Sequence, residues 1–430
     1  MPKLNEVFGI SNSVPQYTYV DRSGLDNTFA YSLGSDRHIV LHGGSKQGKT
    51  VLRRKNLPEE QSVVVQCSAT TTCAELYAQI LATLGASVPT SSSTKSSTSG
   101  EVNAKAGFAL PFVVNSEAGG KFVKGSETTQ NSQAVGNDVK NAHYLSEIIR
   151  GSKRRVIVED FHYMPEDEKR HLAFDLKAFW DLGTFFLIVG IWAEHNLLTF
   201  YNSDLSGRID EIDVQWEDQE LDKVLSKGED VLQIIFGQNI RSQIISDASQ
   251  NVGLLQRLAE KFCFFSGVLE TTNATLAKTV SDEGTLQRAR AKICDEEAVR
   301  YRQFGQALSH GFKASEESEL KVYMNIARCA IEATDQELRA GLHYNTLFDR
   351  ISGMNSRIRR SDLTAALQRL NRLQEDRQVS PLVFSYNDKT RELQLVDREL
   401  LFYRKYGQPT WPWADDVDDV DGSPTADEAT

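Results

Sequence analysis

The sequence lacks long hydrophobic runs and contains few cysteines. Its longest apolar stretch, near 185–192, falls well short of the roughly 18 residues of a membrane-spanning helix. Residues 1–16 have no apolar segment of signal-peptide length. The five cysteines are odd in number and scattered, without the paired spacing of zinc ligands. We therefore expect a cytoplasmic protein with no membrane span and no zinc site.

An excess of basic residues is also missing. The chain has 48 Lys and Arg against 59 Asp and Glu, a net charge of −11. The charge is uneven, because residues 414–430 carry seven acidic residues and no basic one, whereas residues 341–407 carry 12 basic against 8 acidic residues. Phosphate binding needs Lys and Arg, and a local excess of them supplies it. The acidic total therefore does not exclude nucleic acid as a partner of the C-terminal part.

Strands alternate with helices in the first half of the chain, which predicts an α/β layer with a parallel sheet. The predicted strands cover 37–42, 62–67, 155–158 and 184–189, and the predicted helices cover 50–54, 72–84, 139–149 and 166–179. A segment rich in Ser, Thr and Gly, 88–138, interrupts this pattern and is interpreted as an insertion with a possible hairpin at 108–114 and 121–124. After Trp216 we expect helices only, as far as Phe312.

The C-terminal part predicts a winged helix. Three predicted helices precede two extended runs joined by a polar turn, which is the winged-helix order. The helices cover 320–333, 344–351 and 361–375, and the extended runs cover 382–386 and 392–396. The expected domains are a nucleotide-binding core at 1–216, a helical lid and linker at 217–318, a winged helix at 319–408 and a disordered acidic tail at 409–430.

One motif carries specific chemistry. Residues 43–50 match the phosphate-loop pattern G-x-x-x-x-G-K-[ST] in full, between a predicted strand and a predicted helix. Backbone N–H groups and the helix N-terminus bind phosphate, Lys49 reaches the β- and γ-phosphates, and the Thr50 hydroxyl binds Mg²⁺. The predicted nucleotide-binding residues are Gly43, Gly44, Ser45, Lys46, Gln47, Gly48, Lys49, Thr50 and Val51.

A second motif is the apolar strand 156–158, which ends in Glu159 and Asp160. Carboxylates at such a strand end lie beside the phosphate loop. By position, Glu159 serves the metal through water and Asp160 polarises the attacking water. His162 follows closely, and either couples the nucleotide state to a ligand or is a hydrogen-bonded histidine under the sheet.

Together these motifs resemble AAA+ ATPases, in particular the branch of origin-recognition initiators and TniB/TnsC-type transposition regulators. The resemblance covers about Tyr17–Phe264 and the winged helix, and it implies ATP, Mg²⁺ and self-association. Residues 19–22 resemble the adenine-side linker of the family, and 185–198 resemble its strand-glycine-polar segment. Arg208 stands where the family carries an arginine finger that acts on a neighbouring subunit, although it also fits a surface arginine before a strand.

The chain departs from the family pattern at three places. The two acids come in the order Glu–Asp instead of the usual Asp–Glu, so the assignment of the base stays open between them. Ile191 and Trp192 replace the polar sensor, whose role passes to Glu194 or Asn196 or is missing. In the lid, Gln256 occupies the position of the sensor arginine, and Arg257 follows it. These departures predict slow hydrolysis, with ATP used mainly as a switch.

The predicted winged helix offers a surface for DNA. Ser361 is the expected N-cap of the helix 361–375, and arginines before it are placed to contact phosphates. The predicted DNA-binding residues are Arg359, Arg360, Arg369, Arg372, Lys389 and Arg391. The alternative is a winged helix that contacts protein, with these side chains simply solvated.

The sequence therefore predicts an ATP-hydrolysing, oligomeric AAA+ switch that acts on DNA in initiation, transposition targeting or defence against mobile elements. A STAND-like signal-sensing ATPase whose winged helix binds a protein effector is the alternative, and an ATP-binding protein with negligible turnover is a third possibility. A GTPase is not expected, because residues 204–207 match the short D-x-x-G pattern but no Asn-Lys-x-Asp motif is present. The insertion either contacts DNA or a neighbouring subunit or is a surface loop. The acidic tail either covers the basic module or aids solubility.

Overall fold

The computed structural model describes residues 1–11, 13–22, 24–86, 139–192, 195–272, 277–312 and 321–414. The hairpin expected in the insertion, with Lys105, Lys121 and Lys124, and the acidic residues after Ala414 lie outside this range, as does Glu194. Among the described helices, none combines the length and the apolar character needed to cross a bilayer.

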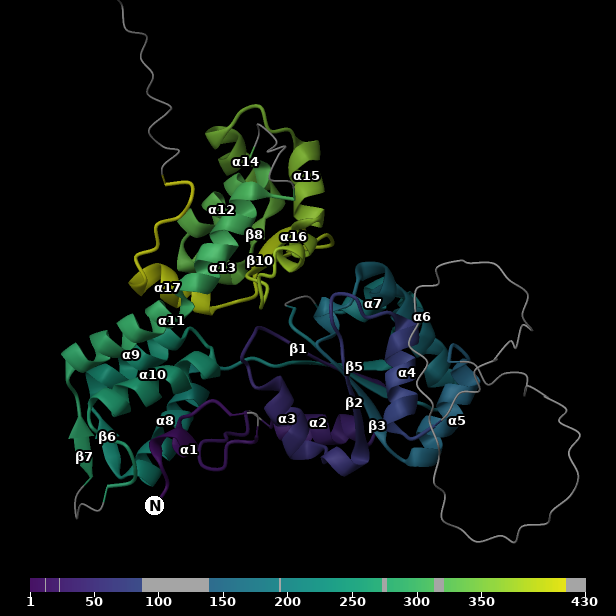
Figure 1. Cartoon of the computed structure of the whole chain (residues 1–430), viewed down its shortest axis with the longest axis horizontal. Helices are drawn as coiled ribbons and strands as arrows, with labels where there is room; N and C mark the ends of the chain where they lie inside the picture. The colour runs from purple at the N-terminus through teal and green to yellow at the C-terminus, as the bar shows by residue number, and fades with distance from the viewer. Residues whose placement is uncertain are drawn as a thin grey trace, which may run out of the picture.

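A parallel sheet of five strands, in the order β2-β3-β4-β1-β5, forms the first part of the molecule (Figure 1). Alternate residues of its central strands face two separate hydrophobic clusters, one on each side of the sheet. The predicted α/β layer with a parallel sheet is therefore confirmed. The strands are β1 (His38–His42), β2 (Ser62–Gln66), β3 (Arg155–Glu159), β4 (Phe186–Val189) and β5 (Ile209–Asp213).

Helices cover both faces of this sheet. On one face, α2 (Leu25–Leu33) and α3 (Lys49–Asn56) bury Phe29 and Leu52 against Ile39 and Leu41 of β1. The other face is covered by α4 (Cys73–Thr83), α5 (Ala142–Ser152) and α6 (Glu166–Asp181). Short helical segments complete the sheet domain: η1 (Glu59–Gln61), η2 (Phe161–Tyr163), α7 (Leu197–Tyr201) and η3 (Ser203–Leu205).

A second region contains helices and one small sheet. Its elements are α1 (Leu4–Val7), α8 (Asp218–Leu232), β6 (Ile234–Phe236), α9 (Gln238–Ala248), α10 (Val252–Phe265), β7 (Lys278–Val280) and α11 (Glu283–His310). The expectation that strands end at Trp216 is wrong, because β6 and β7 pair in parallel. Each has three residues, which is too short to show the alternation by which a strand is recognised in sequence.

The C-terminal module contains helices in the three predicted regions and strands in the two predicted extended runs, together with α13, β8 and α17, which were not predicted. Its elements are α12 (Val322–Glu332), α13 (Asp335–Ala340), β8 (Leu342–His343), α14 (Tyr344–Met354), α15 (Arg360–Gln368), α16 (Leu370–Asp376), β9 (Phe384–Asn387), β10 (Glu392–Leu395) and α17 (Glu399–Tyr406). The three strands pair antiparallel in the order β8-β10-β9.

The predicted helix 361–375 differs in two respects. It is divided into α15 and α16 at Arg369, and its first N-cap is Arg359 instead of Ser361. The Asp362 carboxylate accepts a hydrogen bond of 2.9 Å from the Arg359 backbone N–H, which favours a start two residues earlier than expected.

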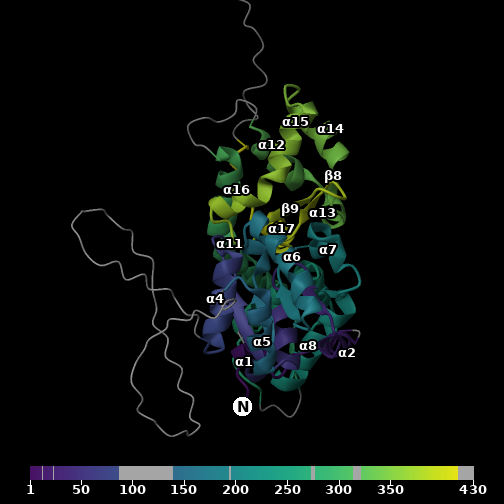
Figure 2. The ribbon, with the colours of Figure 1, turned by 90° about the vertical axis from the view of Figure 1, so that its right-hand side faces the viewer.

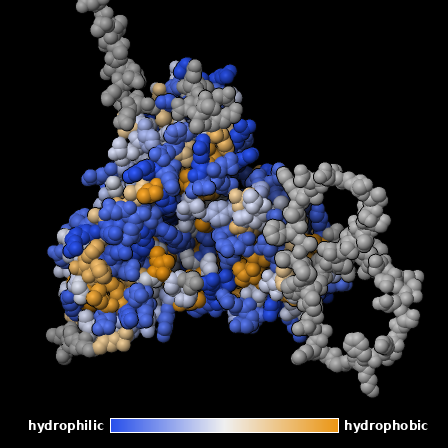
Figure 3. All heavy atoms as spheres, viewed as in Figure 1, coloured by the Kyte–Doolittle hydropathy of each residue, from blue (hydrophilic) through white to orange (hydrophobic). Residues whose placement is uncertain are grey.

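The helical region and the C-terminal module share one hydrophobic core. Tyr301 of α11 stacks on Tyr403 at 4.5 Å between ring centroids, and Phe304 contacts Phe384 at 5.7 Å. Trp411 is also buried in this core, although the sequence places residues 409–414 in the tail. Figure 2 shows the C-terminal module above the sheet domain, and Figure 3 shows hydrophilic residues over most of the face in view, with separate hydrophobic patches.

Candidate nucleotide-binding site

The phosphate loop connects β1 to α3, as the sequence predicts. Gly43 and Gly48 have φ values of 131° and 80°, which L-residues with side chains rarely adopt. A Cβ at Gly43 would lie 2.7 Å from the backbone oxygen of Val214, so the loop passes β5 too closely for a side chain. The glycines thus let the loop turn into the N-terminus of α3, where backbone N–H groups are available to an anion.

Lys49 is buried within this loop, with 7% of the residue exposed. Its Nζ donates hydrogen bonds to the backbone oxygens of Gly43 at 3.2 Å and of Gly44 at 2.7 Å. Burial lowers the pKa of Lys49 to about 8, although nearby Glu159 and Asp213 favour the charged form. A phosphate in the loop would offer this ammonium group an acceptor of full negative charge.

The two acids at the end of β3 have different environments. Glu159 is buried, and its Oε1 accepts hydrogen bonds from Arg53 of α3 at 3.0 and 3.2 Å. Burial raises the pKa of Glu159, and the Arg53 guanidinium opposes this shift. Asp160 has a left-handed backbone, with φ of 56°, and accepts a hydrogen bond of 2.7 Å from Gln66 of β2. Arg53 is a site residue that the sequence analysis missed.

Asp213 is a third carboxylate, also missed from the sequence. It ends β5, which pairs with β1 beside the phosphate loop. One of its oxygens lies 3.2 Å from the place of a Cβ on Gly43, and its charge favours protonated Lys49. A strand next to β1 that ends in an acid brings that acid to the same sheet edge, but the sequence alone does not show that β5 pairs with β1.

An apolar pocket of about 200 Å³ adjoins the loop. Val20, Val51 and Val252 line it, together with Trp216, over which the Arg22 guanidinium lies at 4.4 Å. Arg22 and the Trp216 indole both donate to the Gln47 backbone oxygen, each at 3.0 Å. Residues 19–22, expected on the adenine side, therefore lie between the loop and a pocket suited to a flat base. The remaining lining residues are Ile10, Ser11, Pro15, Thr18, Tyr19, Lys46, Gly48, Gly253 and Gln256.

The side chains of the two neighbouring lid residues, Gln256 and Arg257, contact different parts of the molecule. Gln256 lines the apolar pocket, and its Nε2 donates to the Thr18 hydroxyl at 3.4 Å. Arg257 instead pairs with Glu296 at 3.0 Å and with Glu297 at 2.6 Å, so its guanidinium is engaged in ion pairs with α11. A sensor arginine at the phosphates is therefore missing from this position of the lid.

The positions after β4 are largely structural. Trp192 is buried, and its backbone oxygen accepts a hydrogen bond of 3.1 Å from Gly43. His162 is also buried and accepts a hydrogen bond of 3.3 Å from the Ile191 backbone at Nδ1. Burial lowers the pKa of His162 to about 3, so the ring is neutral at physiological pH. This fits the hydrogen-bonded interpretation of His162.

Arg208 lies at the far edge of the sheet. It precedes β5, whereas Asp213 at the other end of the same strand adjoins the phosphate loop. Five strand residues separate the two edges by about 13 Å. The Arg208 guanidinium lies 4.6 Å from the Trp180 ring and donates to the Asp204 backbone oxygen. Arg208 therefore does not reach the phosphate loop of its own chain.

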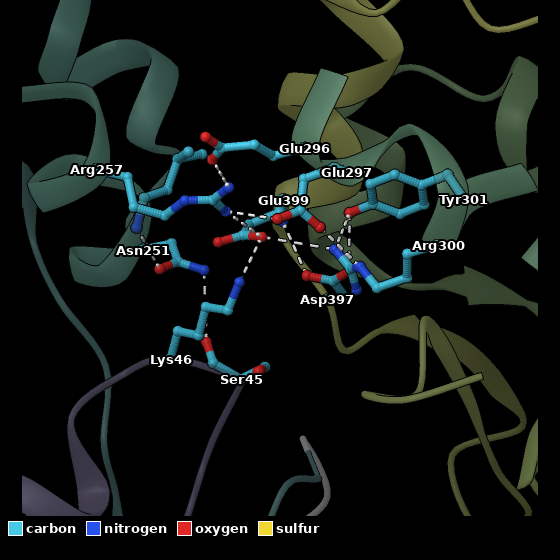
Figure 4. A network of polar contacts seen from close by, with 11 residues as sticks. Ser45, Lys46, Asn251, Arg257, Glu296, Glu297, Arg300, Tyr301, Asp397 and Glu399 are labelled. Carbon is cyan, nitrogen blue, oxygen red and sulfur yellow. Dashed lines mark hydrogen bonds and ion pairs between the residues drawn. The ribbon is translucent and has the colours of Figure 1, made fainter. Parts of the chain in front are cut away.

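The phosphate loop also contacts the C-terminal module (Figure 4). Lys46 Nζ lies 2.8 Å from the buried carboxylate of Glu399 in α17, which also faces Arg257 at 3.4 Å and Arg300 at 3.5 Å. A Cβ on Gly44 would lie 3.2 Å from the Val396 backbone oxygen. The loop is therefore held against α17 as well as against the sheet domain.

The predicted DNA-binding residues fall into separate groups. Arg360 and Arg391 pack on aromatic rings of α14, at 4.2 Å from Phe348 and 4.1 Å from Tyr344 respectively. Arg372 and Lys389 line a cleft of about 760 Å³ between the C-terminal module and α6–α7 of the sheet domain, where Lys389 lies 4.2 Å from the Phe200 ring. Arg359 and Arg369 are exposed at the two ends of α15. The cleft between the C-terminal module and α6–α7 is lined by acidic and basic side chains, among them Glu166, Asp167, Lys169 and Arg170.

Comparison with protein-family models finds no match, and comparison with curated protein sequences finds none either. Among solved structures, a Walker-type ATPase of Pyrococcus abyssi is 15% identical, with a TM-score of 0.50 over 93% of this chain and 99% of that chain. This chain therefore has the same overall fold as that Walker-type ATPase. Weaker similarities are to the ORC1 protein of Aeropyrum pernix, solved in complex with DNA (11% identity, TM-score 0.40, 94% and 95% covered), and to Cdc6p of Pyrobaculum aerophilum (10%, 0.39, 94% and 98%).

Proposed function

We propose that this protein binds ATP with Mg²⁺ and hydrolyses it slowly, as an AAA+ switch. The observation that carries the proposal is one continuous site, in which buried Lys49 lies among Glu159, Asp160 and Asp213 and next to an apolar pocket. Phosphates, a divalent cation and a base each have matching groups there.

The residues present suit Mg²⁺, because carboxylate and hydroxyl oxygens are its preferred ligands. Thr50 and Glu159 would hold the ion, which neutralises charge on the β- and γ-phosphates when bound. Both hydrogen bonds from Arg53 are accepted by Oε1 of Glu159, so Oε2 is able to accept one from a water of the ion. Asp160 would orient the attacking water, since its carboxylate lies at the strand end and is less buried than Glu159.

Slow turnover follows from the lid. Arg257 forms ion pairs with Glu296, Glu297 and Glu399, and Gln256 is uncharged, so neither of these two lid positions supplies a cation to the γ-phosphate. A cation from a neighbouring subunit would complete the site, and Arg208 is our candidate because it does not reach the loop of its own chain. Binding of a fluorescent ATP analogue and release of phosphate, measured on the same preparation, test the proposal. Failure to bind ATP in the presence of Mg²⁺ would refute it.

Duplex DNA is the proposed target, as in the initiator and transposition-regulator branch. The supporting observation is the exposure of Arg359, Arg369 and Arg372 along α15 and α16, with a net positive charge in this module. We expect binding to weaken steeply with salt. Replacing Arg369 and Arg372 together by Ala should flatten the log–log salt slope by about 2, whereas replacing exposed Arg154 of the sheet domain should not.

A STAND-like ATPase with a protein effector is the second candidate. The hydrophobic core that α11 shares with the C-terminal module favours this candidate. A module packed on α11 through such a core acts as a structural part of the lid. Absence of duplex binding at low salt, with and without ATP, would select this candidate over the DNA switch.

A further inference from the structure

Three potential metal ligands meet beside the phosphate loop, and Asp213 of the nucleotide site lies within reach of them. His42 ends β1, Glu211 and Asp213 lie on the adjacent strand β5, and His195 follows β4. Single ligand atoms of His42, His195 and Glu211 all lie within 4.8 Å of one another. His195 Nε2 is also 3.9 Å from an oxygen of Asp213.

His42 is held as a ligand would be. Its side chain is 0% exposed and its ring is stacked on Trp192, with 5.6 Å between centroids and 5° between planes. Its Nδ1 lies 3.3 Å from the Trp192 backbone oxygen, which accepts only if Nδ1 carries the proton. The other nitrogen, Nε2, then presents a lone pair.

A carboxylate lies close to this nitrogen. His42 Nε2 is 3.2 Å from Glu211 Oε1, yet it is buried and has no hydrogen-bond partner of good geometry among the described residues. A nitrogen lone pair and a carboxylate oxygen repel at this distance unless a cation lies between them. Two ligands at 2.0–2.2 Å from a tetrahedral ion are about 3.3–3.6 Å apart, so the observed 3.2 Å is close to the lower end of that range.

The Glu211 carboxylate is itself held in position by hydrogen bonds. The Asn196 backbone N–H donates to both oxygens of Glu211, at 2.9 and 2.7 Å. Asn196 adopts a left-handed backbone, with φ of 61°, directly after His195. One turn therefore presents one ligand and orients another, as outer groups do in metal sites.

We propose that His42, His195 and Glu211 form a binding site for a divalent transition-metal ion of the Zn²⁺ type, with Asp213 in reach as a fourth ligand. Two imidazoles and a carboxylate select such an ion over Mg²⁺ or Ca²⁺, which prefer oxygen ligands. The His195 side chain is 64% exposed and lines the cleft below the C-terminal module, which gives the ion a path of entry. The expectation of no zinc site rested on cysteine spacing and did not consider these separated histidines.

A second cluster in the sheet domain does not have these features. Cys73, Glu168 and His171 also lie close together, but the Cys73 thiol donates to the Glu168 backbone oxygen at 3.4 Å. Burial raises the pKa of this thiol well above its ordinary range, so a metal ion would have to displace the proton of a buried, hydrogen-bonded thiol.

The test uses the full chain without an affinity tag and without nucleotide, so that its result does not depend on ATP binding. After removal of metal by a chelator, Co²⁺ is added as a spectroscopic probe, and Zn²⁺ is measured by its displacement of Co²⁺. We expect one Co²⁺ per chain with the visible absorption of a tetrahedral site. His195→Ala and Glu211→Gln should each weaken binding at least about tenfold.

Exposed His143 on α5 provides the matched control, and His143→Ala should bind as the wild type does. His195 is exposed, so its removal should leave the fold intact, which circular dichroism checks. The proposal is overturned if the wild type binds no Co²⁺ in stoichiometric amount, as a proton shared by His42 and Glu211 would predict. It is also overturned if both variants bind with the wild-type affinity.

Discussion

At the scale of single residues, the phosphate loop surrounds a lysine whose charged form is disfavoured by burial. Lys49 is buried, and burial brings its pKa down to about 8, from an ordinary value of about 10.4. The carboxylates of Glu159, Asp213 and Asp160 limit this shift. Proton loss from Lys49 is therefore expected within the pH range in which proteins are studied.

We predict that ATP affinity is full below pH 8 and falls as the pH rises through 8, because neutral Lys49 no longer attracts phosphate. Above pH 8, binding should be accompanied by proton uptake, since the bound phosphates stabilise the charged lysine. Titration calorimetry in buffers of different ionisation enthalpy measures both. Lys49→Arg should remove this pH dependence, and Lys49→Ala should abolish binding at every pH.

Asp160 and Glu159 are distinguished by their partners. We predict that Asp160→Asn lowers the rate of hydrolysis by about 10²–10⁴ and changes ATP affinity little, because a general base acts in the transition state. Glu159→Gln should instead weaken the Mg²⁺-dependent part of ATP binding. Single-turnover kinetics and equilibrium binding separate the two effects. The reverse pattern would assign the base to Glu159.

At the scale of elements, sequence patterns predict the helices and strands that are long and have a regular spacing of apolar residues. The strands 37–42 and 155–158 were predicted within two residues of β1 and β3, because buried β-branched runs are distinctive. The pair β6–β7 was missed because a strand of three residues is too short to show the alternation of apolar and polar residues. Asp213 was missed because the pairing of β5 with β1 is a feature of the tertiary structure. Arg53 was missed because its ion pair with buried Glu159 can be seen only in the three-dimensional structure.

Gln374 joins α16 to β9 in the C-terminal module. It is fully buried, its Oε1 accepts from the backbone of Val383 at 2.9 Å and of Phe384 at 3.2 Å, and its Nε2 donates to the Phe384 oxygen at 2.8 Å. We predict that Gln374→Ala lowers the free energy of unfolding by about 2–4 kcal/mol, because these buried groups lose their partner. Exposed Gln368→Ala should change it by less than about 0.5 kcal/mol in the same denaturant titration. Equal effects of the two substitutions would contradict this assignment.

At the scale of the whole molecule, our proposal makes hydrolysis depend on contact between neighbouring chains. We predict that Arg208→Ala loses hydrolysis and keeps ATP binding, because its guanidinium acts on the loop of a neighbour. Mixing Arg208→Ala with Lys49→Ala should restore part of the activity, since one chain supplies the loop and the other the arginine. Exposed Arg154→Ala is the control. Unchanged turnover in Arg208→Ala would rule out this role.

The contact between Lys46 and Glu399 has a consequence for regulation. A side chain of the phosphate loop is paired with a helix of the C-terminal module, 353 residues later in the sequence. Because free energies of coupling are reciprocal, any partner that displaces α17 from the loop must change nucleotide affinity by the same factor by which nucleotide changes the affinity for that partner. A nucleotide titration at several concentrations of a candidate partner, duplex or protein, would therefore measure this coupling factor, and the nucleotide site would act as a sensor of what the C-terminal module has bound.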